Sequence, residues 1–197
     1  MEPILTAIVG VNADLIEQVF KLYVKKGETV ADVTYGLGKF WTKIDKSRYV
    51  TFLTDIAGEP SVDFRSLPYA AESMDVLILD PPYMHGSETA KESITNCYGR
   101  LSGNHNDVVR LYAGGILEAA RVLRKKTGRI MVKCQDEIES GKQRLSHVEI
   151  KQLLELSGFE IIDLFVLVQN TIPAMREDYQ KSARKNHSYL WLARLKS

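Results

Sequence analysis

Four consecutive residues near the middle of the chain, Asp80-Pro81-Pro82-Tyr83, directly follow an apolar run and combine a carboxylate, a stiff turn and an aromatic ring. Two successive prolines cannot continue a strand, because neither has an amide hydrogen to donate, and their fixed φ angles give a rigid, extended exit. We therefore expect the Asp80 carboxylate and the Pro81 carbonyl to point outward together as two preorganised hydrogen-bond acceptors. The alternative is that the segment only terminates a strand.

A second candidate is the glycine-containing segment Asp32-Val33-Thr34-Tyr35-Gly36-Leu37-Gly38. Glycine lets the backbone turn sharply and approach a ligand closely, because it has no Cβ. The nicotinamide fingerprint needs a third Gly or Ala where this chain has Trp41, so the pattern argues against a dehydrogenase. The alternative is an ordinary tight turn from a strand into a helix.

A sheet must position these two segments, and the hydrophobic pattern supplies one. Helical spacing of apolar residues predicts helices that start at Asn12 or Asp14, at Val108, and at Ser146, where Ser146 to Glu149 matches a capping box. Apolar runs predict strands over residues 29–33, 49–54, 76–79, 130–134, 160–168 and 189–193, with a weaker one near Val62. This alternation predicts an α/β fold with a doubly wound, mostly parallel sheet and helices on both faces.

Ligands of such sheets bind beyond the carboxyl ends of the strands. Asp32, Asp55, Asp63 and Asp80 all lie at or near predicted strand ends. We therefore expect four carboxylates along one edge.

Length and composition set limits on the protein. At 197 residues and 45% hydrophobic content, the chain can build one substantial core but not two ordinary domains. The formal net charge of +1 means that any nucleic-acid binding must come from a local patch. Cys97 and Cys134 fit neither a disulfide framework nor a zinc site, so we expect no metal. No apolar run is long enough to span a membrane, and we expect a soluble, cytoplasmic protein.

Together these segments resemble the amino-methyltransferases of DNA, a branch of the class I S-adenosylmethionine-dependent methyltransferases. The resemblance runs along most of the chain: residues 12–25 resemble the helix before the cofactor loop, 32–40 the loop itself, 80–83 the catalytic loop, 117–123 a recurrent helix end and 185–190 the final strand. It implies a Rossmann-like methyltransferase fold and one methyltransferase domain over residues 1–197, with no separate target-recognition domain.

The resemblance also assigns S-adenosylmethionine as cofactor. It implies a cofactor site formed by Asp32, Thr34, Gly36, Gly38, Asp55 and Asp63. A strand-end carboxylate can accept hydrogen bonds from both ribose hydroxyls, which is the role expected of Asp55. Asp63 is expected to accept from the adenine amine, and Asp32 to face the methionine ammonium directly or through water. The alternative for each is a turn or cap aspartate.

In the implied reaction, an exocyclic amine of a nucleic-acid base donates hydrogen bonds to Asp80 and to the Pro81 carbonyl. These bonds draw the amine toward a tetrahedral geometry and free its lone pair to attack the sulfonium methyl group. Alignment of the reactants supplies much of the rate. Tyr83 is expected to stack on the base, with a packed aromatic as its alternative.

Contacts to the substrate are expected from Arg176, Lys181, Arg184 and Lys185, the only basic-aromatic concentration in the chain, which can bind phosphates. A solvated surface is the alternative. The aspartate at position 80 favours adenine N6 in DNA, a tendency carried by the resemblance. The rivals are an RNA base amino-methyltransferase and a non-catalytic, methyltransferase-like nucleic-acid-binding subunit. Site recognition could come from a homodimer or a separate specificity partner.

Overall fold

The computed structural model describes residues 3–82, 104–170 and 182–196. Its helices are α1 (Asn12–Tyr23), α3 (His105–Val122) and α4 (Ser146–Leu156), with short 3-10 turns η1 (Lys39–Trp41) and η2 (Lys46–Arg48). Its strands are β1 (Ala7–Val9), β2 (Thr29–Asp32), β3 (Val50–Leu53), β4 (Val76–Leu79), β5 (Arg129–Cys134), β6 (Glu137–Glu139), β7 (Lys142–Arg144), β8 (Phe159–Val168) and β9 (His187–Leu195).

Seven strands form one sheet in the order β1-β8-β9-β5-β4-β2-β3. The pairings of β2 with β3 and β4, of β4 with β5, and of β1 with β8 are parallel, and β9 runs antiparallel between β5 and β8. All four residues of β4 are buried, as expected for a central strand covered on both faces. The mostly parallel α/β sheet predicted from the sequence is confirmed.

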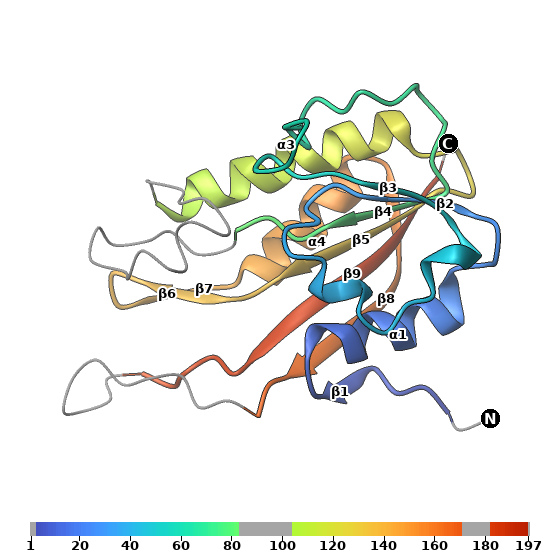
Figure 1. Ribbon diagram of the computed structural model, residues 1–197. Coiled ribbons are helices and arrows are strands. Elements are labelled where there is room, and N and C mark those ends of the chain that lie inside the picture. The colour runs from blue at the N-terminus through green and yellow to red at the C-terminus, as the bar shows by residue number, and fades with distance from the viewer. Residues whose placement is uncertain (1–2, 83–103, 171–181, 197) are drawn as a thin grey trace.

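Helices cover both faces of this sheet (Figure 1). On one face α3 and α4 pack against alternate residues of β4 and β5, and on the other α1 and η1 pack against the remaining ones. The hairpin of β6 and β7 leaves the sheet at the end where β4 and β5 finish and where α3 begins (Figure 1). The carboxyl ends of the parallel strands therefore share one edge, called the carboxyl edge below.

Two local predictions are wrong. No strand forms near Val62, because its amide donates to the Asp55 carbonyl at 3.0 Å and folds the segment back onto the end of β3. The capping box at Ser146 is also wrong. Ser146 is itself the first helical residue, its buried Oγ has no hydrogen-bond partner in the described part of the chain, and Glu149 binds His105 instead. In the described ranges, no helix has the length and apolar character needed to cross a membrane.

Candidate functional site

The catalytic-loop candidate leaves β4 directly, and the glycine segment is bonded to it. Asp80 donates its backbone N–H to Thr34 Oγ1 at 2.8 Å. Since β2 and β4 are neighbouring parallel strands, this bond fixes the start of one loop against the other. The two segments singled out by the sequence are therefore brought together at the carboxyl edge.

Asp32, the last residue of β2, is almost completely buried, with 1% of its surface exposed. Its Oδ1 accepts from the Thr34 amide at 3.1 Å and its Oδ2 from the Trp41 indole at 2.7 Å. Burial raises the pKa of Asp32 to about 7, against the opposing effect of these two hydrogen bonds. The hydrogen bond from the Thr34 amide fixes the Asp32 carboxylate against the glycine segment. Because the pKa of Asp32 is about 7, the charge of this carboxyl changes near neutral pH.

Asp55, two residues beyond β3, organises the other side of the glycine segment. Its Oδ2 accepts from the Gly36 amide and its Oδ1 from the Ala57 amide, both at 2.9 Å. Gly36 and Gly38 have φ angles of 50° and 67°, in the left-handed region that glycine adopts at little cost. The backbone therefore turns sharply at both glycines.

A cavity of about 310 Å³ opens where these groups meet. The glycine segment and the residues after β3 line it, among them Tyr35, Gly36, Thr54, Asp55 and Gly58. Its volume is at the low end of the range for small-molecule sites, roughly 300–1,000 Å³. A carboxylate oxygen can accept more than one hydrogen bond, so Asp55 retains capacity for hydroxyl donors of a ligand.

Asp63 does not line this cavity. Its two carboxylate oxygens receive hydrogen bonds from the Arg65 guanidinium, and the shortest, from Nη2, measures 2.7 Å. The hydrogen bonds from Arg65 hold the pKa of Asp63 below its usual range. Asp32, Asp55 and Asp80 follow the ends of adjacent strands, whereas Asp63 lies in a surface loop beyond them.

Asp80 has a buried counter-charge that sequence reasoning missed. Lys133 Nζ, on the neighbouring strand β5, lies 3.5 Å from Asp80 Oδ1. Burial raises the pKa of Asp80, while the positive charge of Lys133 opposes that shift. The available signal was a lysine inside the otherwise apolar run of residues 130–134.

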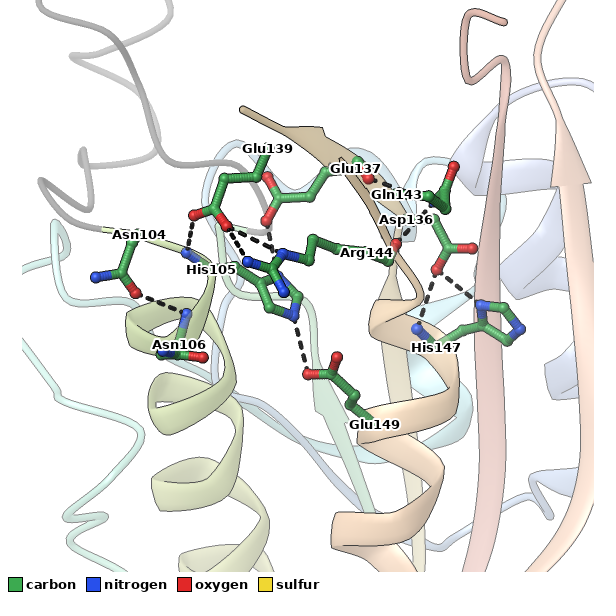
Figure 2. Close-up of polar contacts among 10 residues, drawn as sticks. All are labelled: Asn104, His105, Asn106, Asp136, Glu137, Glu139, Gln143, Arg144, His147 and Glu149. Atoms are coloured by element: carbon green, nitrogen blue, oxygen red, sulfur yellow. Dashed lines mark hydrogen bonds and ion pairs between the residues drawn. The ribbon is translucent and has the colours of Figure 1, made fainter. Parts of the chain in front are cut away.

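A second polar group, called the His105 cluster, lies beside the hairpin and comprises His105, Glu137, Glu139, Arg144 and Glu149 (Figure 2). Glu137 Oε1 and Glu149 Oε2 each lie 2.9 Å from a ring nitrogen of His105. Burial alone would lower the pKa of His105, but the two carboxylates outweigh it and the pKa is raised. The cluster thus joins α3, β6 and α4, with a carboxylate on each ring nitrogen of His105.

The backbone of the same helix start is also tied to the hairpin. The His105 amide donates to Glu139 Oε1 at 2.7 Å, and Arg144 Nη2 donates to Glu139 Oε2 at 2.7 Å. A separate pair lies nearby, in which His147 Nδ1 is 2.7 Å from Asp136 Oδ1 (Figure 2). The residues of Figure 2 therefore fasten the hairpin and two helix starts to one another.

The basic residues expected to bind substrate are only partly covered by the structure. Arg184 and Lys185 lie just before β9, at the carboxyl edge, with Arg184 exposed and Lys185 partly exposed. Gln135 Nε2 fixes the backbone at this point by donating to the His187 carbonyl at 2.8 Å. Tyr83, Arg176 and Lys181 lie outside the described residues.

A larger cavity of about 510 Å³, which the sequence did not indicate, lies at the start of α1. Gly10 to Ala13, Lys39 and Thr42 line it, together with Gln169 and Asn170 beyond β8. Asn12 Oδ1 is buried, and no residue in the described ranges donates a hydrogen bond to it. Lys39, the residue that follows the glycine segment, lines this larger cavity, whereas Tyr35 to Leu37 of the segment line the smaller one.

Comparison with known proteins gives a fold but no family. No family model and no curated protein sequence matches the chain. Among solved structures, an S-adenosylmethionine-dependent methyltransferase from Methanosarcina mazei matches with a TM-score of 0.56 and 13% identity, over 91% of this chain and 98% of that one.

Two further structures share the fold. One is 1,6-didemethyltoxoflavin-N1-methyltransferase from Burkholderia thailandensis with S-adenosylhomocysteine bound, at TM-score 0.58 and 10% identity over 95% of this chain and 79% of that one. The other is the cyclase SpnF, at TM-score 0.56 and 19% identity over 93% and 81%. The predicted Rossmann-like methyltransferase fold is thus confirmed, and the presence of a cyclase shows that this fold does not fix the reaction.

Proposed function

We propose that this chain transfers a methyl group from S-adenosylmethionine to the exocyclic amine of a nucleic-acid base, with adenine N6 in DNA as the first choice. The observation that carries the proposal is the hydrogen bond from the Asp80 amide to Thr34 Oγ1, which places a cofactor-type glycine loop and an acceptor-bearing Asp-Pro-Pro loop side by side. Methyl transfer needs this adjacency, because the sulfonium methyl and the amine must meet in line.

The cofactor is proposed to lie along the glycine segment. Its adenosine would occupy the 310 Å³ cavity, with the ribose hydroxyls donating to Asp55. Asp32 would act on the methionine ammonium through its charge or through a water molecule, because its side chain is almost completely buried. Asp63, expected from the sequence to accept from the adenine amine, does not line this cavity and binds Arg65 instead, so we do not give it a role in this site.

The chain's own residues would supply the chemistry at the amine. The Asp80 carboxylate and the Pro81 carbonyl would accept its two N–H groups and leave the nitrogen lone pair directed at the methyl group. The methylated nitrogen then loses a proton, so no strong general base is required. A base in a duplex would first have to leave the helix, at a cost of a few kcal/mol.

The identity of the acceptor can be tested by tracing the methyl group. Purified protein would be incubated with methyl-labelled S-adenosylmethionine and separate pools of DNA, RNA and base-like small molecules, and labelled polymer would be digested to nucleosides. We expect label in N6-methyldeoxyadenosine, incorporated far more slowly with Asp80→Ala. Label in RNA would replace DNA by RNA, label only in small molecules would end the nucleic-acid proposal, and no transfer to any pool would end the methyltransferase proposal.

The nucleic-acid partner is proposed to contact Arg184 and Lys185, together with Arg176 and Lys181. Each neutralised phosphate contributes about 0.9 to the slope of log affinity against log salt for duplex DNA. Charge reversal of Arg184 and Lys185 should therefore flatten the slope by nearly two. Lys125→Glu, at the opposite edge of the sheet just before β5, is the matched control and should leave it unchanged. An unaltered slope in the double variant would place the binding surface elsewhere.

A further inference from the structure

Lys133 carries a charge in the interior of the sheet. Its side chain is 1% exposed, and among the residues that the structure describes, no other lysine or arginine is buried. Burial of an ammonium group is strongly unfavourable unless a counter-charge lies close by. The burial of Lys133 therefore requires a nearby counter-charge, which a surface lysine does not need.

The counter-charge is the carboxylate proposed to activate the amine. Leu79 and Val132 are register partners in the parallel pair β4 and β5, so the next residues along the two strands, Asp80 and Lys133, are adjacent. Lys133 Nζ lies 3.5 Å from Asp80 Oδ1, which is buried and accepts no hydrogen bond from the residues that the structure describes. The Asp80 side chain as a whole is 18% exposed, so its remaining exposed surface belongs to atoms other than Oδ1.

The other titratable groups around Asp80 do not replace this cation. On the opposite neighbour β2, Asp32 adds negative charge, and the Asp80 carboxylate in turn raises its pKa. On β5 the buried Cys134 thiol has a raised pKa and is neutral. From α3, the hydroxyl of Tyr112 donates to the Lys133 carbonyl. In the described part of the chain, Lys133 is thus the cation that acts on Asp80.

We propose that Lys133 is a positioning residue for Asp80, which holds Oδ1 on the β5 side and keeps the carboxylate ionised while the rest of the group faces the target amine. This inference rests on the proposed function for its catalytic meaning. We do not place Lys133 in contact with substrate or cofactor. A lysine that only filled space in the sheet would affect stability and nothing else.

The ionisation of Asp80 can be followed directly by ¹³C NMR of its carboxyl carbon, with Asp80→Asn identifying the resonance. In Lys133→Met, loss of the cation should raise the pKa of Asp80 by about 1–3 units. The acid limb of the single-turnover rate profile should move to higher pH by the same amount. Lys133→Arg should restore both, because it returns the charge.

Arg129→Met is the matched control, since it breaks another ion pair at the opposite end of the same strand. Arg129 Nη2 lies 2.6 Å from Glu28 Oε1, and the two side chains are 14% and 18% exposed. This variant should lower the unfolding temperature without moving the pKa of Asp80. An unchanged Asp80 pKa in folded Lys133→Met would overturn the inference.

If Lys133→Met does not fold, the double variant Lys133→Met/Asp80→Asn removes both charges together. Its rate should equal that of Asp80→Asn alone, because Lys133 has no role except through Asp80. A rate well below that of Asp80→Asn would overturn the inference. If the wild-type chain transfers no methyl group at all, the proposed function fails, and the NMR titration alone decides on Lys133.

Discussion

Two groups of polar side chains lie at the carboxyl edge, the His105 cluster and the residues around Asp55 and Asp80, and they differ in how many of their polar atoms are hydrogen-bonded. In the His105 cluster, both ring nitrogens of a buried histidine contact carboxylates, and its backbone amide binds a third. Around Asp55 and Asp80, by contrast, Asp80 Oδ1 is buried near the Lys133 ammonium and accepts no hydrogen bond from the described residues, and a cavity opens beside Asp55. A network whose polar atoms all have hydrogen-bond partners stabilises a fold, whereas acceptor atoms that can still accept hydrogen bonds beside a cavity can bind a ligand.

The largest effect should follow from changing Asp80. Asp80→Ala removes an acceptor aimed at the developing charge, and loss of such a group typically costs on the order of a hundred- to a thousand-fold in rate. Asp80→Asn keeps an acceptor oxygen without the charge and should retain more activity. Single-turnover methyl transfer measures both, with affinity for S-adenosylmethionine expected to stay within a few-fold. Full activity in folded Asp80→Ala would remove this residue from the reaction.

The His105 cluster should respond in the opposite way. His105→Ala removes one partner of the buried Glu137, and loss of one member of a buried pair costs about 3 kcal/mol of unfolding free energy. Denaturant unfolding measures that cost, while the rate per folded molecule should be unchanged. His147→Ala is the comparison, since the His147 side chain is 20% exposed and its loss should cost less. A rate loss matching that of Asp80→Asn would make the cluster part of the active site.

Asp55→Ala tests the cofactor cavity. Hydrogen bonds to a charged group contribute about 1.5–3 kcal/mol, so affinity for S-adenosylmethionine should fall roughly ten- to a hundred-fold by calorimetric titration. Asp45→Ala is matched, because Asp45 also accepts from the amide two residues on, at 3.1 Å, but in an exposed turn. That control should bind normally. Equal affinities in both variants would remove Asp55 from the site.

The smallest effect is a pH dependence of cofactor affinity. Because the pKa of Asp32 is raised to about 7, this carboxyl is ionised above that pH and protonated below it. The positively charged cofactor prefers the ionised form, so its affinity should fall as the pH drops through 7, by at most about tenfold per pH unit. Titrations between pH 6 and 8, in which binding should also release protons, measure this. An affinity independent of pH would separate Asp32 from the cofactor.

The sequence predicted elements that depend on local patterns and missed contacts between distant residues. The continuous apolar run of residues 76–79 predicted the central strand β4. The two prolines after it predicted where that strand ends. The strand near Val62 failed because a contact with Asp55 outweighed its weak propensity. The partners of His105 lie 32 and 44 residues away, so no spacing rule could find them.

We expect the glycine segment and Asp55 to bind S-adenosylmethionine, and the His105 cluster not to bind it. Hydrogen–deuterium exchange with and without saturating S-adenosylmethionine compares both regions in one measurement. Exchange should slow in peptides covering residues 34–38 and 55–60 and stay unchanged in those covering 136–149. Unchanged exchange in residues 34–38 and 55–60, or slower exchange only in residues 136–149, would contradict cofactor binding at the glycine segment.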